Sequence, residues 1–335
     1  MGGARAMSGA ALTDAEAARR ATAVLRDLAG QSRSCPGVAW AVGAYDSGGQ
    51  KWFYATSNEG MSFLPLGVRW DPQVLLVFDP AAPEAGWLPW RGLANPARIV
   101  LDHFLLLRKS LPELRLVSLV STAPRGEAVD RAAAQFGAVR PSEDADFAPV
   151  GPSEPSLARL ETVDQALYQQ VVSQLPVQRR WPVALALAED ALRLALRHDP
   201  EASRSEPELD AGFAALRTGR EIAAILERVE AARDEFAARA QAKRVPDQRL
   251  DPVDPSAGLG TWADVATVGE PFAYAGPFWR ARIATMLAIL LRVRADDAYL
   301  SKEQVGEIAY EHFCVAEDPE ATGGLLRGFF DAGDP

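Results

Sequence analysis

The sequence is poor in the residues that bind metals. Its 335 residues include three histidines, at positions 103, 198 and 312, and two cysteines, Cys35 and Cys314. Zinc sites need about four converging Cys, His or carboxylate ligands, and the patterns H-E-x-x-H, C-x-x-C and H-x-E are all missing. We therefore expect no metal and no cofactor, and we expect reduced thiols, with one long-range disulfide as the alternative.

Signatures of common enzyme classes are also missing. No G-x-S-x-G or S-x-x-K pattern presents an activated serine, and no Walker glycine-lysine pattern occurs. The stretch 258–263 matches the loose G-x-G-x-x-A pattern. It follows a loop rich in Pro and Asp rather than a strand, so it is more typical of a helix N-terminus. The sequence predicts a protein that is not an enzyme, although a catalytic triad assembled from scattered residues stays open.

Positive charge and long apolar runs are in short supply as well. Lys and Arg number 35 against 45 Asp and Glu, a net charge of -10, which argues against nucleic acid as the main partner. The longest mostly apolar run, residues 283–291, lies between Arg282 and Arg292 and is far shorter than the ~20 residues that span a bilayer. The first twelve residues lack the apolar core of a secretory signal. We expect a cytoplasmic protein without a transmembrane segment.

What the sequence does contain indicates two domains. Hydrophobic residues make up 48% of the chain, enough for sizeable cores, and the length exceeds the roughly 150 residues of a typical domain. Four prolines, at 141, 149, 152 and 155, lie together with Ser, Asp and Glu in a stretch whose composition cannot bury a core. The prediction is an α+β chain with a mixed α/β domain over residues 13–140, a Pro-rich linker over 141–156 and a helical bundle over 157–331.

The first domain alternates helical and strand patterns. Thr13 and Glu16 form a capping-box pattern at the start of a helix that Gly30 is expected to end. The expected elements are helix 13–28, hairpin strands 38–45 and 51–56, a meander through 63–68 and 74–78, helix 95–110 with Pro96 at its first position, strand 114–120 and helix 127–136.

This order of elements is found in nucleoside-deaminase folds. Their chemistry needs a zinc-binding His followed two residues later by a Glu, and then a C-x-x-C. Here Phe104 and Leu105 follow His103, and no cysteine lies between 36 and 313. The expectation is a small sheet with at most a degenerate, non-catalytic deaminase-like topology, in which His103 is a partly buried residue of a helix.

Only helices are expected after the linker. Thr218 is predicted to be the N-cap of one of them, with Glu221 completing a capping box. Trp181 and Pro182 are predicted to begin another. The expected helices cover residues 181–198, 218–244, 276–294, 301–315 and 319–330, which together indicate a bundle.

Two groups of segments have distinctive sequences. The first group is residues 40–43, 56–60 and 64–68, and the second is residues 180–184, 269–280 and 307–320. Together they resemble the paired domains of unknown function in mycobacterial and related actinobacterial proteins associated with type VII (ESX) secretion, the EspK-like proteins. The resemblance implies a cytosolic chaperone or adaptor that binds a secretion substrate, with a protein partner, no cofactor and no catalytic residues.

Four large aromatic residues of the second group, Phe272, Tyr274, Phe278 and Trp279, lie within eight positions beside glycines and prolines. Rigid aromatics of this kind are good anchors for a protein partner. The alternative is that they fill the bundle core at a helix start.

Residues 307–320 bring His312 and Cys314 close together among carboxylates. On a helix two positions differ by ~200°, so these side chains point to nearly opposite sides and are expected to be packing residues. Two other functions stay open: an enzyme that uses the α/β domain on a nucleotide-like small molecule, and a secreted effector.

Overall fold

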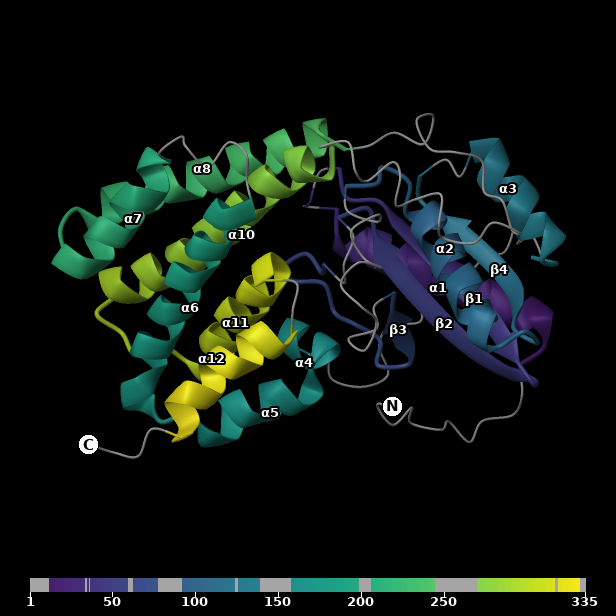
Figure 1. The fold of residues 1–335 in the computed structure, drawn as a ribbon, viewed down its shortest axis with the longest axis horizontal. Helices are drawn as coiled ribbons and strands as arrows, with labels where there is room; N and C mark the ends of the chain where they lie inside the picture. Colours follow the sequence, from purple (N-terminus) through teal and green to yellow (C-terminus); the bar gives the residue numbers. More distant parts are fainter. Residues whose placement is uncertain are drawn as a thin grey trace.

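A computed structural model describes residues 12–33, 35, 37–59, 63–77, 92–123, 126–138, 158–198, 206–244, 270–316 and 319–331. Within these ranges the chain has an α+β fold, as predicted: a small sheet with helices comes first, and an all-helical part follows (Figure 1). The predicted linker, 141–156, lies outside the described residues.

The sheet has four strands in the order β3-β2-β1-β4. Strands β1 (Trp40–Ser47) and β2 (Gln50–Ser57) form the predicted antiparallel hairpin, whose turn uses Gly48 and Gly49 at φ 60° and 88°. Strand β4 (Arg115–Ser121) runs antiparallel to β1, and β3 (Val74–Leu76) runs parallel to β2.

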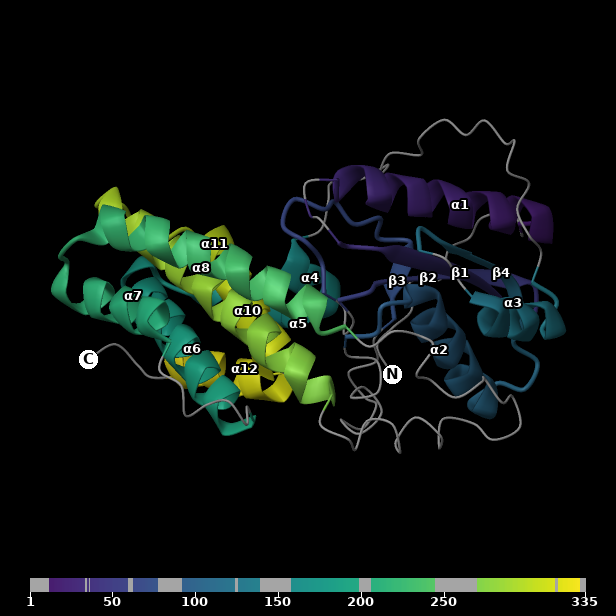
Figure 2. The same cartoon turned by 90° about the horizontal axis from the view of Figure 1, so that it is seen from above.

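Helices cover both faces of this sheet (Figure 2). Helix α1 (Asp14–Gln31) lies on one face, and α2 (Pro96–Ser110) and α3 (Gly126–Gln135) lie on the other. The capping box of α1 is confirmed, because Thr13 Oγ1 accepts from the Glu16 N–H at 3.3 Å while Glu16 Oε2 accepts from the Thr13 N–H at 2.8 Å. Asn95 caps α2 through Ala97, with Pro96 first in the helix.

Two predictions for this part are wrong. Residues 63–68 form no strand, because Pro65 has no N–H to donate and Gly67 turns the chain at φ 86°. The three-residue β3 then pairs in parallel with β2, so no meander forms. Gly30 does not end α1 either: the helix continues to Gln31, and Ser32 closes it by donating to the carbonyl of Leu28.

The helical part is built around α10 (Glu270–Ala295), which packs against α6, α7, α8 and α11. The other elements are α4 (Arg159–Val163), α5 (Gln165–Gln174), α6 (Val177–His198), α7 (Pro207–Thr218), α8 (Ile222–Ala242), α11 (Lys302–Ala316) and α12 (Pro319–Asp331). The starts and ends predicted for α11 and α12 are confirmed to within one residue. Helices α4, α5 and α7 were not predicted.

Helix α6 begins four residues before Trp181, so Pro182 lies inside it, and Pro277 likewise lies inside α10. A proline leaves the carbonyl four residues earlier without its helical donor. Those residues, Gln178 and Ala273, are both exposed, so water can reach the carbonyls and the helices continue.

The capping box predicted for Thr218 and Glu221 is wrong. Thr218 is the last residue of α7, which Gly219 ends in the left-handed conformation at φ 69°. Glu221 precedes α8 with φ 54° and makes no side-chain cap. The motif spans the end of one helix and the start of the next, a turn that the periodicity of either helix does not reveal.

Candidate functional site

The two parts of the chain meet around the residues that follow β2. One apolar core continues from the α1 face of the sheet into the helices. The segment 58–64, which we call the junction segment, enters this contact; its described residues are Asn58, Glu59, Phe63 and Leu64. All four are buried, so their polar groups need partners within the protein.

Glu59 is held by the end of α8 and the start of α10. Arg244 forms an ion pair with one carboxylate oxygen of Glu59, and the hydroxyl of Tyr274 donates to the other. Arg244 also donates to the backbone carbonyl of Asn58. Burial, and then the charge of Glu59, raise the pKa of Tyr274 well above its ordinary value, so its hydroxyl keeps the proton that it donates.

Leu64 is held through its backbone. Arg159 Nη1 donates to the Leu64 carbonyl at 2.9 Å, and the Leu64 N–H donates to Tyr310 Oη at 2.7 Å. Arg159 donates to Glu307 Oε2 and Glu311 Oε1 at 2.7 Å each and lies 4.4 Å from the Tyr310 ring centroid. Burial lowers the pKa of Arg159, but the carboxylates of Glu311 and Glu307 together raise it by more. The pKa of Arg159 is therefore above its ordinary value.

Phe63 lies between these two anchors. Its ring meets that of Phe278 edge to face, with centroids 5.6 Å apart. The guanidinium carbon of Arg282 lies 4.5 Å from the Phe63 centroid and 5.1 Å from the Phe278 centroid, a cation–π arrangement. Arg282 also pairs with Glu311 at 3.4 Å, so the aromatic contact and the ion pairs form one network.

The predicted partner-binding residues lie at this junction. The side chain of Phe272 is outside the described part of the structure. Tyr274, Phe278 and Trp279 are 1%, 8% and 3% exposed, which agrees with the alternative that they fill the core at a helix start. Tyr274 and Phe278 contact the chain's own junction segment. Their use as anchors for a separate partner stays a prediction.

His312 and Cys314 are both buried and have different neighbours. The ring nitrogens of His312 lie 2.8 Å from Thr322 Oγ1 and 3.0 Å from Asp190 Oδ2, while burial raises the pKa of the Cys314 thiol to about 12. The carboxylate of Asp190, the imidazole of His312 and the hydroxyl of Thr322 are linked in the same order as the groups of a catalytic triad. The side chains of His312 and Thr322 are fully buried, so this chain of hydrogen bonds joins α6, α11 and α12 within the bundle. No motif in the sequence indicates this chain of hydrogen bonds.

His103 also belongs to a buried cluster. It packs against Tyr54 and Tyr45, and Tyr45 Oη lies 3.3 Å from its Nδ1. Burial lowers the pKa of His103 to about 3, so the ring is neutral. Beside it Arg98 pairs with Asp102 at 3.2 Å. Among the residues that the structure describes, no group of three or more His, Cys, Asp or Glu could hold a metal ion. The deaminase-like topology stays a prediction.

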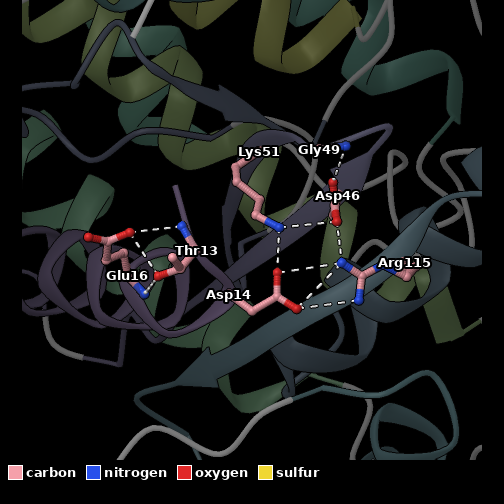
Figure 3. A network of polar contacts seen from close by, with 7 residues as sticks. All are labelled: Thr13, Asp14, Glu16, Asp46, Gly49, Lys51 and Arg115. Carbon is pink, nitrogen blue, oxygen red and sulfur yellow. Dashed lines mark hydrogen bonds and ion pairs between the residues drawn. The ribbon is translucent and has the colours of Figure 1, made fainter. Parts of the chain in front are cut away.

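A second ion-pair network fixes α1 on the sheet (Figure 3). Lys51 pairs with Asp46 at 3.1 Å and also with Asp14, while Arg115 contacts the same two carboxylates. Asp46 also accepts from the N–H of Gly49 in the hairpin turn at 2.9 Å. Two positive and two negative side chains thus satisfy one another, and the network ties the start of α1 to β1, β2 and β4.

In the part of the chain that the structure describes, none of the helices has the length and apolar character needed to cross a membrane. No family model matches the chain, and neither a curated protein nor a solved structure is similar to it at a significant level.

Proposed function

We propose that the chain is a non-catalytic protein-interaction protein, acting as a cytosolic chaperone or adaptor for a type VII secretion substrate. One observation supports the proposal: four of the six segments that resemble EspK-like proteins meet at the junction. Residues from 56–60 and 64–68 lie against residues from 269–280 and 307–320, in contacts made by Glu59 with Tyr274 and by Leu64 with Tyr310. These four segments therefore include residues by which the two parts of the chain contact each other.

A fixed pair of domains suits an adaptor. The shared apolar core, the ion pair of Arg244 with Glu59 and the hydrogen bond from Arg159 to the Leu64 carbonyl join the two parts into one unit. A preorganised surface loses less conformational entropy when a partner binds, which favours affinity. In this proposal the buried charges of the junction maintain the shape of the protein, and recognition of the substrate depends on that shape.

The test is co-expression of the chain with each type VII secretion substrate encoded in its source genome, followed by affinity purification, size exclusion and native mass spectrometry. We expect a stoichiometric complex with at least one substrate, and none with an acidic control protein of similar size. If every substrate elutes separately while the chain is folded, the proposal fails. A thermal shift produced by nucleotides would favour the enzyme alternative, and recovery of the protein from culture filtrate would favour the secreted effector.

A further inference from the structure

The outer face of α1 carries a row of positive charge. Arg19, Arg26 and Arg33 follow one another at intervals of seven residues, and all three are exposed, with Arg33 in the turn after the helix. Seven residues are nearly two helical turns, so these arginines lie along one side at intervals of about 10 Å. The carboxylate of Glu16, at the start of this face, accepts from the N–H and the hydroxyl of Thr13. The face is therefore positive, although the whole chain has a net charge of -10.

The outer face of α8 carries the opposite charge. Glu227, Asp234 and Glu235 are exposed, and the first two are again seven residues apart. Arg233 donates to Oδ1 of Asp234 at 2.8 Å, but the Asp234 side chain stays 70% exposed. The neighbouring Arg228 pairs with a glutamate of α7. Carboxylates with this exposure can accept charge-assisted hydrogen bonds from the arginines of a second molecule.

Small side chains beside both rows of charge repeat at the same interval of seven residues. They are Ala15, Thr22 and Ala29 on α1, and Ala224, Ala231 and Ala238 on α8. The distance between two packed helix axes depends on the side chains at the contact, and small ones allow a close approach. Charged residues that flank such a contact select which helices pair. The two faces are therefore complementary in charge and in spacing.

The two faces belong to different parts of one molecule. Figures 1 and 2 show α1 over the sheet and α8 in the helical part, separated along the long axis of the molecule. A second copy of the chain, in contrast, can present its α8 to the α1 of the first. If the same contact also forms in the reverse direction, the result is a closed pair with two equal contacts.

We infer that the chain binds a second copy of itself by placing α1 of each copy against α8 of the other, so that Arg19, Arg26 and Arg33 lie opposite Glu227, Asp234 and Glu235. The charge complementarity of the two exposed faces carries this inference. It goes beyond the proposed function and does not depend on it, because the contact needs no secretion substrate.

Salt should control the pairing. Each chain has a net charge of -10, so two copies repel each other at long range. At 0.1 M salt the Debye length is about 10 Å, which weakens that repulsion more than it weakens ion pairs within a contact. At 1 M salt the Debye length is about 3 Å, and exposed ion pairs are then screened as well. We therefore expect a pair at about 0.1 M salt that dissociates at about 1 M salt.

The first measurement uses the wild-type chain in sedimentation velocity, at protein concentrations up to about 0.1 mM. Twice the mass of one chain at the lower salt concentration, and one chain at the higher, is the expected result. A wild-type chain that stays monomeric at the lower salt concentration, or that pairs equally well at both, overturns the inference.

The second measurement exchanges the charges of the two faces. Reversal of either face should raise the dissociation constant at least ~10-fold, because like charges then meet. The two variants are Arg19→Glu/Arg26→Glu/Arg33→Glu and Glu227→Arg/Asp234→Arg/Glu235→Arg. Mixed in equal amounts, they should form a pair again, because each α1–α8 contact in the mixed pair joins opposite charges.

A matched control separates this contact from a general effect of charge. Lys109→Glu/Arg131→Glu/Arg197→Glu makes the same change in net charge at exposed positions of α2, α3 and α6, and it should pair as the wild type does. Circular dichroism checks that each variant has the helix content of the wild type. The inference fails if the α1 variant pairs as tightly as the control, or if the two folded variants stay monomeric when mixed.

Discussion

Replacing Arg159 with methionine should be among the most destabilising single changes in the chain. The Arg159 side chain is 5% exposed, and it neutralises Glu311, which is 1% exposed. In the variant, Glu311 would keep only the 3.4 Å contact to Arg282, and the Leu64 carbonyl would lose its donor. Removing one partner of a buried ion pair costs about 3–5 kcal/mol. Methionine has a similar stem, so little of that loss comes from packing.

The assay is urea unfolding followed by circular dichroism and tryptophan fluorescence. Arg159→Met should lower the free energy of unfolding by about 3–5 kcal/mol, and the double variant Arg159→Met/Glu311→Gln should lose less than the sum of the single variants. The matched control is Arg228→Met, because Arg228 pairs with Glu208 at 2.6 Å but is 51% exposed; it should lose about 0–1 kcal/mol. If Arg159→Met costs no more than this control, the account of the junction is wrong.

Three other predictions concern strain, acid stability and thiol reactivity. Gly92→Ala should lower the free energy of unfolding, measured by thermal unfolding, by ~1–3 kcal/mol, because Gly92 has φ 66° and an added Cβ would lie 2.6 Å from the ring of Tyr274. The control Gly137→Ala should lower it less, because Gly137 has φ 83° but no atom lies within 4 Å of the added Cβ. The pKa of Asp190 is lowered from 3.8 to about 2, chiefly by its hydrogen bond with His312. The contribution of Asp190 to stability is therefore present above pH ~4 and is lost as the pH falls to ~2. Asp190→Asn should reduce the pH dependence of the unfolding free energy over that range, and an unchanged slope would contradict this. With Ellman's reagent at pH 8 the native chain should titrate one thiol, Cys35, because burial raises the pKa of Cys314 to about 12; two fast thiols without denaturant would oppose this reasoning.

Local chemistry explains which parts of the fold could be predicted. Thr13 with Glu16, Asn95 with Pro96, and the paired glycines of the hairpin act within a few residues of themselves, and each forms as expected. The failures involve competition between neighbours. Thr218 could cap a following helix but instead ends the preceding one.

The junction could not be predicted, because its partners lie far apart in the chain. Arg159 pairs with Glu311 across 152 positions, and Glu59 pairs with Arg244 across 185. Neither pair produces a local pattern of charge. The aromatic cluster around Tyr274 was identified from the sequence, yet its direction, toward solvent or toward the junction, depends on the packing of the whole bundle.

Hydrogen exchange at the backbone amide of Leu64 tests most directly whether the helical part of the chain holds the junction segment. This amide donates to Tyr310 Oη at 2.7 Å. In the wild type it should exchange at least ~10³-fold more slowly than in an unstructured peptide, with a marked acceleration in Tyr310→Phe while amides of the β1–β2 hairpin stay protected. Exchange of the wild-type Leu64 amide within about tenfold of the unstructured rate would contradict the account.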